Sequence, residues 1–392
     1  MNSNKKYNFD ELIERSNTAS VKYDLRQLFF GKDDVIPMWV ADMDFRTPDF
    51  IMNAIRERAN HEILGYSIRP ESYFTSLIDW LKRRHNWEIR KEWIAFSPGI
   101  VPAVNMAVRA FSKRRDKIII QPPVYFPFFD AVKKHGRKLV FNQLVMENGR
   151  YRMDYENLEQ LCCDGAGMLI LSNPHNPAGN AWRADELKKM ADICVKYNVL
   201  IVSDEIHCDL VNRGFKHTVL ALLSPEIDAQ TVTMVAPSKT FNIAGMATAS
   251  VIISNPLLMK KFRKVLDALH IELGNVFGNV ASEAAYTYGD EWLEQLLDYL
   301  DGNITTLIDF AEKNLPQIKV IRPEATYMAW LDFSKTGMNS KELKEFVIEK
   351  AGLGLNEGVQ FGPGGEGYMR INLACPRQTL IKALNQLKLA FS

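Results

Sequence analysis

The 392-residue sequence is poor in cysteine, lacks long apolar runs and carries almost no net charge. Its five cysteines are scattered without Cys-x-x-Cys spacing, which predicts reduced thiols in a cytoplasmic protein and no metal site. No apolar run reaches the roughly 18 residues that a membrane span needs, and the polar residues 1–6 predict no secretory signal. With 48 basic and 47 acidic residues, the composition favours neither nucleic acid nor a membrane surface as a partner.

What the chain has is length and an ordinary globular composition, with 47% hydrophobic and 24% charged residues. A chain of this length is expected to form two domains. Its middle part alternates helical patterns with short β-branched runs, which predicts a mostly parallel sheet covered by helices on both faces. The predicted strands are residues 93–96, 117–120, 139–141, 168–171, 199–202, 231–235 and 249–253.

The pattern changes after the last of these strands. A long helical region without strands is expected from about residue 279 to 315, followed by an α+β module. Its strands are predicted at 318–321, 326–332 and 368–373, and its helices at 340–351 and 377–390. Residues 1–45 are expected to be irregular and to pack back against this module. The expected division is therefore a large domain of residues 46–285 and a smaller one of residues 1–45 and 286–392.

Five residues that could carry chemistry follow predicted strands: Gly99, Tyr125, Asn176, Asp204 and Lys239. In an open parallel sheet, ligands bind beyond the carboxyl ends of the strands, so these residues are expected to share one site. Each has a simpler explanation by itself, such as a turn, a cap or a surface lysine. Together they offer an amine, a carboxylate, an amide, an aromatic ring and the N–H groups of a helix N-terminus, which is the set that pyridoxal 5′-phosphate (PLP) requires.

On these residues the sequence resembles the fold-type I PLP enzymes of the aspartate aminotransferase superfamily, and within them the C–S lyases of the MalY/PatB type, often called cystathionine β-lyases. The resemblance covers nearly the whole chain and implies a seven-stranded, mostly parallel sheet in the large domain. The segments that carry it are 39–45 (Trp-Val-Ala-Asp-Met-Asp-Phe), 65–67 (Gly-Tyr-Ser), 172–179 (Ser-Asn-Pro-His-Asn-Pro-Ala-Gly), 203–207 (Ser-Asp-Glu-Ile-His), 238–242 (Ser-Lys-Thr-Phe-Asn), 327–332 (Tyr-Met-Ala-Trp-Leu-Asp) and 370–377 (Arg-Ile-Asn-Leu-Ala-Cys-Pro-Arg).

The resemblance implies that Lys239 binds the PLP aldehyde and later shuttles a proton. Asp204 is implied to pair with the ring nitrogen, Tyr125 to stack on the ring and Asn176 to donate to its phenolic oxygen. These residues include the three implied catalytic groups, Lys239, Asp204 and Tyr125. Arg370 is implied to clamp the substrate carboxylate in a bidentate pair, as a guanidinium can.

The same resemblance implies a homodimer with shared sites and assigns further contacts. The implied phosphate ligands are Gly99, Ile100, Val101, Ser238 and, from the neighbouring subunit, Tyr66. The implied substrate contacts, besides Arg370, are Ala41, Asn176 and Tyr66. No metal is implied.

Three positions depart from the aminotransferase pattern. Ala236 and Ala247 stand where many members carry a phosphate-binding serine and arginine, so other groups are expected to hold the phosphate. His207 stands where a tyrosine usually contacts the phenolic oxygen of PLP, and it is expected either to donate there or to support Asp204.

The implied function is cleavage of cystathionine or cysteine-S-conjugates to a thiol such as homocysteine, pyruvate and ammonia. Two alternatives remain open at this point. One is a PLP-dependent aminotransferase of class I/II, which shares the first steps. The other is a non-catalytic regulatory binding protein.

Overall fold

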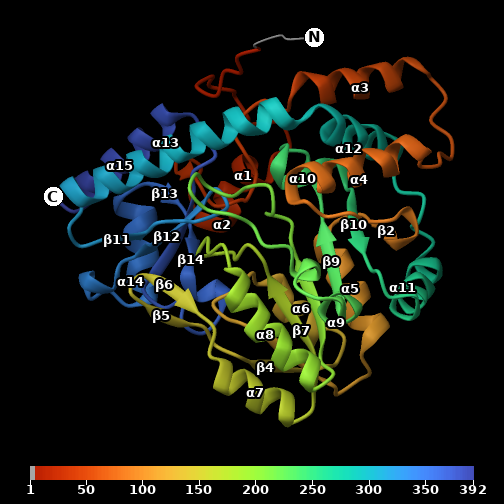
Figure 1. The fold of residues 1–392 in the computed structure, drawn as a ribbon. Helices are drawn as coiled ribbons and strands as arrows, with labels where there is room; N and C mark the ends of the chain where they lie inside the picture. The colour runs from red at the N-terminus through yellow and green to blue at the C-terminus, as the bar shows by residue number, and fades with distance from the viewer. Residues whose placement is uncertain (1–4) are drawn as a thin grey trace.

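The computed structural model describes residues 5–392 and contains the predicted seven-stranded sheet (Figure 1). Its order is β2-β10-β9-β8-β7-β3-β4, and β10 runs antiparallel to both of its neighbours while the other pairings are parallel. The prediction of a mostly parallel sheet is therefore confirmed. The strands are β2 (Ile94–Ser97), β3 (Lys117–Ile120), β4 (Lys138–Phe141), β7 (Ala166–Ser172), β8 (Leu200–Asp204), β9 (Thr231–Val235) and β10 (Ala249–Ile252).

Helices cover both faces of this sheet, which explains why its strands are continuously apolar. Successive side chains of a strand point to opposite faces, so Ile118 and Ile120 join one buried cluster and Ile119 joins another. The first cluster includes α5 (Ile100–Phe111), α6 (Pro127–Lys133) and α11 (Pro256–Leu269). The second includes α7 (Tyr155–Cys163), α8 (Ala184–Lys196) and α9 (Pro225–Ala229).

A second, four-stranded sheet is antiparallel and has the order β11-β12-β15-β14. Its strands are β11 (Lys319–Ile321), β12 (Met328–Asp332), β14 (Asn356–Glu357) and β15 (Tyr368–Asn372). It packs with the long helix α13 (Asp290–Asn314) and with α15 (Arg377–Ala390). The predicted helix at 340–351 appears as α14 (Ser340–Glu345), continued by a π-helical segment, Phe346–Lys350.

The N-terminal stretch packs back against this module, as expected, because β1 (Ile36–Pro37) pairs in parallel with β13 (Leu353–Gly354). It is less irregular than predicted, since it contains the short helices α1 (Val21–Asp24) and α2 (Arg26–Phe30). We propose that the two sheets mark the expected domains, residues 46–285 and residues 1–45 with 286–392.

Sequence analysis missed a hairpin formed by β5 (Val145–Glu147) and β6 (Arg150–Arg152). Its turn is Asn148-Gly149, and both residues have positive φ angles, 50° and 81°. This dipeptide is a strong hairpin signal, because the tight turn needs left-handed backbone at both positions.

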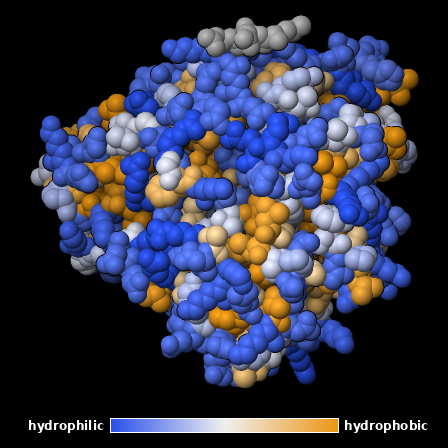
Figure 2. Space-filling view, viewed as in Figure 1, coloured by the Kyte–Doolittle hydropathy of each residue, from blue (hydrophilic) through white to orange (hydrophobic). Residues whose placement is uncertain are grey.

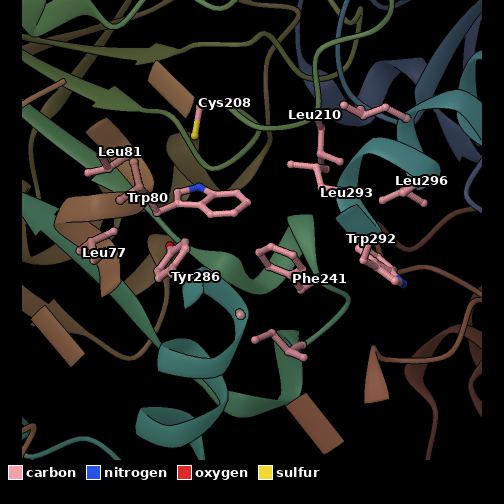
Figure 3. Close-up of a cluster of buried hydrophobic side chains, with 14 of the residues drawn as sticks. Leu77, Trp80, Leu81, Cys208, Leu210, Phe241, Tyr286, Trp292, Leu293 and Leu296 are labelled. Carbon is pink, nitrogen blue, oxygen red and sulfur yellow. The ribbon is translucent and has the colours of Figure 1, made fainter. Parts of the chain in front are cut away.

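A third apolar cluster includes residues of both sheets, such as Val235 of β9 and Met328 of β12, and carries the turn that bears Lys239. It includes residues of α3 (Asp49–Asn60), α4 (Glu71–His85), α12 (Val276–Tyr288) and α13, as the close-up in Figure 3 shows in part. Phe241 is fully buried there, with its ring centroid 5.5 Å from that of Trp80 and 5.7 Å from that of Trp292. Because Phe241 is two residues from Lys239, this packing fixes the position of the short helix α10 (Pro237–Thr240).

The face of the molecule seen in Figure 2 is mostly hydrophilic, with apolar side chains in small separate groups. Within residues 5–392 no helix combines the length and apolar character needed to cross a bilayer. Of the polar stretch at residues 1–6, from which no secretory signal is expected, residues 1–4 lie outside the described residues.

Candidate active site

A cavity of about 240 Å³ opens at the carboxyl ends of the parallel strands. This is where an open α/β sheet binds its ligands. The structure brings together there nearly all of the residues that the sequence singled out. Those that line the cavity are Ala41, Gly99, Ile100, Val101, Tyr125, Asn176, Asp204, His207, Ser238 and Lys239.

Lys239 extends from α10 into this cavity and donates a hydrogen bond from Nζ to the backbone oxygen of Ala41 at 2.6 Å. The hydroxyl of Tyr327 donates to the same oxygen at 3.0 Å. Desolvation inside the protein lowers the pKa of Lys239 to about 8, although Asp42 and Asp204 act in the opposite direction. A larger fraction of this amine is therefore unprotonated near neutral pH than for an ordinary lysine, which suits a nucleophile and proton carrier.

Asp204 is the last residue of β8 and is 5% exposed. Its carboxylate accepts a hydrogen bond from the N–H of Ile206 at 3.1 Å, and among residues 5–392 it forms no salt bridge. Burial raises the pKa of Asp204 to about 7, because a charged carboxylate is poorly solvated there. The side chain therefore lacks the cationic N–H partner that a protonated ring nitrogen would provide.

Arg370, on β15, does not itself line the cavity but fixes the amide of Asn176, which does. Its Nη1 donates to Asn176 Oδ1 at 2.8 Å, so the Asn176 amide N–H groups remain available as donors. Its Nη2 donates to the backbone oxygen of Trp39 and to Asn356 Oδ1. Burial lowers the pKa of Arg370 to about 10, and the guanidinium has neutral partners in place of a carboxylate. It is thus poised to bind an anionic group.

Two rings complete the wall of the cavity. His207 is 3% exposed, and burial, together with Lys239 and Arg370, lowers its pKa to about 3, so the imidazole is neutral. Its ring meets that of Tyr327 edge to face at 6.2 Å. Burial raises the pKa of Tyr125, which therefore stays a neutral phenol.

Sequence analysis missed a second buried carboxylate, Asp209, behind the turn that bears Lys239. It accepts hydrogen bonds from Thr240 Oγ1 at 2.9 Å and Trp80 Nε1 at 3.0 Å, and pairs with His85 Nε2 at 2.8 Å. Asp209 thereby holds the residue next to Lys239 in place. The close spacing of acids in residues 204–209, directly after a buried strand, is the signal that could have drawn attention to it.

Comparison with known proteins places this geometry in a family. The aminotransferase class I and II family model matches residues 33–387. The chain belongs to this family. Cystathionine beta-lyase PatB of Bacillus subtilis (strain 168) is 42% identical over 386 residues, which are 98% of this chain and 100% of PatB.

Two solved structures of class I and II aminotransferase relatives contain PLP and match almost the entire chain. Cystalysin from Treponema denticola is 38% identical, with a TM-score of 0.96 over 99% of both chains. A C–S lyase from Staphylococcus hominis is 36% identical, with a TM-score of 0.92 over 99% of this chain and 98% of its own. The fold-type I architecture implied by the sequence is therefore confirmed.

The residues present fit the cofactor of this family. Asp204 lacks a cationic partner, which the ring nitrogen of PLP would supply, and Lys239 is a desolvated amine. Thr248, which sequence analysis missed, also lines the cavity, and its buried Oγ1 has no hydrogen-bond partner within residues 5–392. A lone threonine beside a strand has no sequence signal that distinguishes it from an ordinary strand residue.

Two predicted site residues do not line the cavity: Arg370, which contacts the lining residue Asn176, and Tyr66. The side chain of Tyr66 is fully exposed, and residues 61–70 form an extended segment without helix or strand. Ile63, Leu64 and Ile68 of the same segment are also exposed, at 71%, 59% and 78%. An apolar segment of this kind suits an interface with another chain.

Proposed function

We propose that this chain is a PLP-dependent carbon–sulfur β-lyase that cleaves cystathionine or cysteine-S-conjugates to a thiol, pyruvate and ammonia. The single observation that carries the proposal is Lys239, a desolvated amine in a cavity that also holds Asp204 and Asn176. The similarity to cystathionine beta-lyase PatB and to PLP-bound C–S lyases supports this reaction over transamination.

When bound, PLP supplies an electron sink that stabilises negative charge at the substrate α-carbon. Asp204 would keep a proton on the ring nitrogen, and Asn176 would donate an amide N–H to the phenolic oxygen. Tyr125, which lines the cavity, would stack on the ring. Each of these side chains projects from a strand end or an adjoining turn, so the sheet sets their spacing.

The substrate is held by Arg370, whose guanidinium receives the α-carboxylate in a bidentate pair. This orients the α-proton toward Lys239. Lys239 would take that proton with the amine that here donates to the Ala41 oxygen. The electron pair left at the α-carbon would form a double bond to the β-carbon as the C–S bond breaks, and the departing thiolate would take up a proton. Water would then hydrolyse the remaining enamine to pyruvate and ammonia. The lowered pKa of Lys239 suits both the uptake and the return of a proton near neutral pH.

Purified protein incubated with cystathionine should release pyruvate and a free thiol without any added keto acid. Lys239→Ala should abolish this turnover, whereas the exposed Lys260→Ala on α11 should match the wild type. Borohydride reduction and peptide mapping should place the pyridoxyl label on Lys239. A label on another lysine would refute the assignment, and pyruvate that forms only with a keto-acid acceptor would favour an aminotransferase.

We further propose that the enzyme is a cytoplasmic homodimer in which Tyr66 reaches the PLP phosphate of the neighbouring subunit. The exposed apolar segment 61–70 supports this arrangement, and so does the position of Tyr66 outside its own cavity. A cytoplasmic location agrees with five free cysteines. A shared site is complete only in the symmetric dimer.

Tyr66→Phe should weaken cofactor retention by about 1–2 kcal/mol, the scale of one hydrogen bond to a charged group, without unfolding the chain. Mixing Tyr66→Phe with Lys239→Ala subunits gives heterodimers in which one site carries both changes and the other carries neither. At limiting PLP, mixed dimers should therefore be more active than either parent. If subunits exchange and activity does not rise, Tyr66 acts within its own chain.

A further inference from the structure

The cavity contains very little positive charge for a site that must hold a phosphate dianion. Lys239 is the one lysine or arginine among the residues of the described chain that line it. Its amine is committed to the cofactor aldehyde under the proposed function. Ala236 and Ala247 add no polar side chain. This chain must therefore hold the phosphate mainly with neutral donors.

The hydroxyl group of Thr248 has no hydrogen-bond acceptor within residues 5–392. Thr248 is 3% exposed and lines the cavity. It follows Ala247, whose left-handed backbone (φ 47°) turns the chain between the Lys239 loop and β10. Leaving a buried hydroxyl unpaired is unfavourable, so a group that completes its hydrogen bond is expected to bind beside it.

Other neutral donors line the same cavity. The 12-residue helix α5 begins at Ile100, and the N–H groups of its first residues have no partner within the helix. The positive end of the helix dipole adds to their attraction for an anion. Ser238 contributes a hydroxyl from the turn that bears Lys239.

We propose that Thr248 donates its hydroxyl hydrogen to the phosphate of PLP. Together with Ser238 and the N–H groups of Ile100 and Val101, it forms a phosphate site that uses no lysine or arginine of its own chain. The inference rests on the proposed function, because it takes PLP as the ligand. The neutral hydroxyl of Thr248 thus replaces part of the phosphate binding that a cationic side chain at the adjacent position 247 would provide.

The test compares PLP with pyridoxal, which lacks the phosphate, by equilibrium titration of the cofactor-free protein. Thr248→Val keeps the shape of the side chain and removes the hydroxyl. It should weaken PLP binding about tenfold or more, the effect of one hydrogen bond to a charged group, and change pyridoxal binding less than about twofold. Thr248→Ser should restore most of the PLP affinity.

The matched control is Thr231→Val, which removes another buried hydroxyl. Its Oγ1 donates to the backbone oxygen of Ile227, and Thr231 does not line the cavity. This variant should bind PLP as the wild type does and lose thermal stability. The cofactor-free Thr248→Val protein should be at least as stable as wild type, because it loses an unpaired hydroxyl.

Inorganic phosphate tests the phosphate site by itself, because it lacks the pyridine ring of PLP. It should raise the melting temperature of the cofactor-free wild type more than that of Thr248→Val. Equal loss of PLP and pyridoxal affinity in Thr248→Val, or no loss of either, would overturn the proposal for Thr248 while Lys239 still carries the pyridoxyl label. Failure of the wild type to bind PLP would instead overturn the proposed function.

Discussion

Two aspartates five residues apart show how differently one segment can use a buried carboxyl group. Asp204 and Asp209 are 5% and 6% exposed. Burial raises the pKa of Asp204 to about 7. Burial acts on Asp209 in the same direction, but hydrogen bonds from His85, Thr240 and Trp80 outweigh it and lower the pKa of Asp209.

The difference lies in what surrounds each carboxylate. Asp204 faces a cavity and receives one backbone N–H, whereas Asp209 faces packed side chains that satisfy it. Glu205 resembles Asp209, since Ser203, His217 and the N–H of Leu220 all contact its carboxylate. A buried carboxyl group with protein partners stabilises the fold, and one without them indicates a ligand.

The largest effect on stability is expected from Asp209→Ala. It leaves the indole N–H of Trp80, the imidazole of His85 and the hydroxyl of Thr240 without their acceptor. Breaking a buried pair of this kind typically costs about 3–5 kcal/mol. Urea unfolding of the holoenzyme should show this loss, and the exposed Asp192→Ala on α8 provides the control. A loss below about 1 kcal/mol would mean that Asp209 is not a structural carboxylate.

Asp204→Asn should instead reduce turnover strongly and leave stability nearly unchanged. PLP should remain bound and the unfolding midpoint should change little, but turnover should fall by at least about 100-fold, as when an electrostatic stabiliser is removed. Pyruvate release from cystathionine measures this loss. Near-normal turnover would mean that Asp204 has only a structural role in the turn after β8. Its function would then not differ from that of Asp209.

The pH dependence of stability should distinguish the contribution of Asp204 from that of Asp209. The pKa of Asp204 is raised, so above its unfolded value of about 4 the folded cofactor-free protein binds the extra proton. Its stability should therefore fall as pH rises from about 4 toward 7, by up to roughly 1.4 kcal/mol per pH unit. Asp204→Asn should remove this slope.

Asp209 has a lowered pKa, so its contribution has the opposite sign. It should be fully present above the unfolded pKa of about 4 and be lost as pH falls through the lower folded value. Comparing the unfolding curves of wild type, Asp204→Asn and Asp209→Ala across this pH range isolates the contribution of each carboxyl group to the free energy of unfolding. Identical slopes for wild type and Asp204→Asn between pH 4 and 7 would contradict the assignment for Asp204.

The sequence by itself determined the seven central strands and the residues at their ends, because both leave local patterns. β-branched runs mark strands buried on two faces, and Gly99, Asp204 and Lys239 interrupt such patterns where the strands stop. Topology then requires the ends of parallel strands to meet at one edge, so the site could be predicted before any contact was known.

The tertiary structure alone decided which polar groups find partners. Nothing local distinguishes Asp204 from Asp209, because the groups that satisfy the Asp209 carboxylate come from distant parts of the chain. His85 and Trp80 reach Asp209 across more than 120 residues, and no side chain reaches the hydroxyl of Thr248 within residues 5–392. Hydrogen bonding and desolvation set the pKa of a buried group, and both depend on packing that only the folded chain creates.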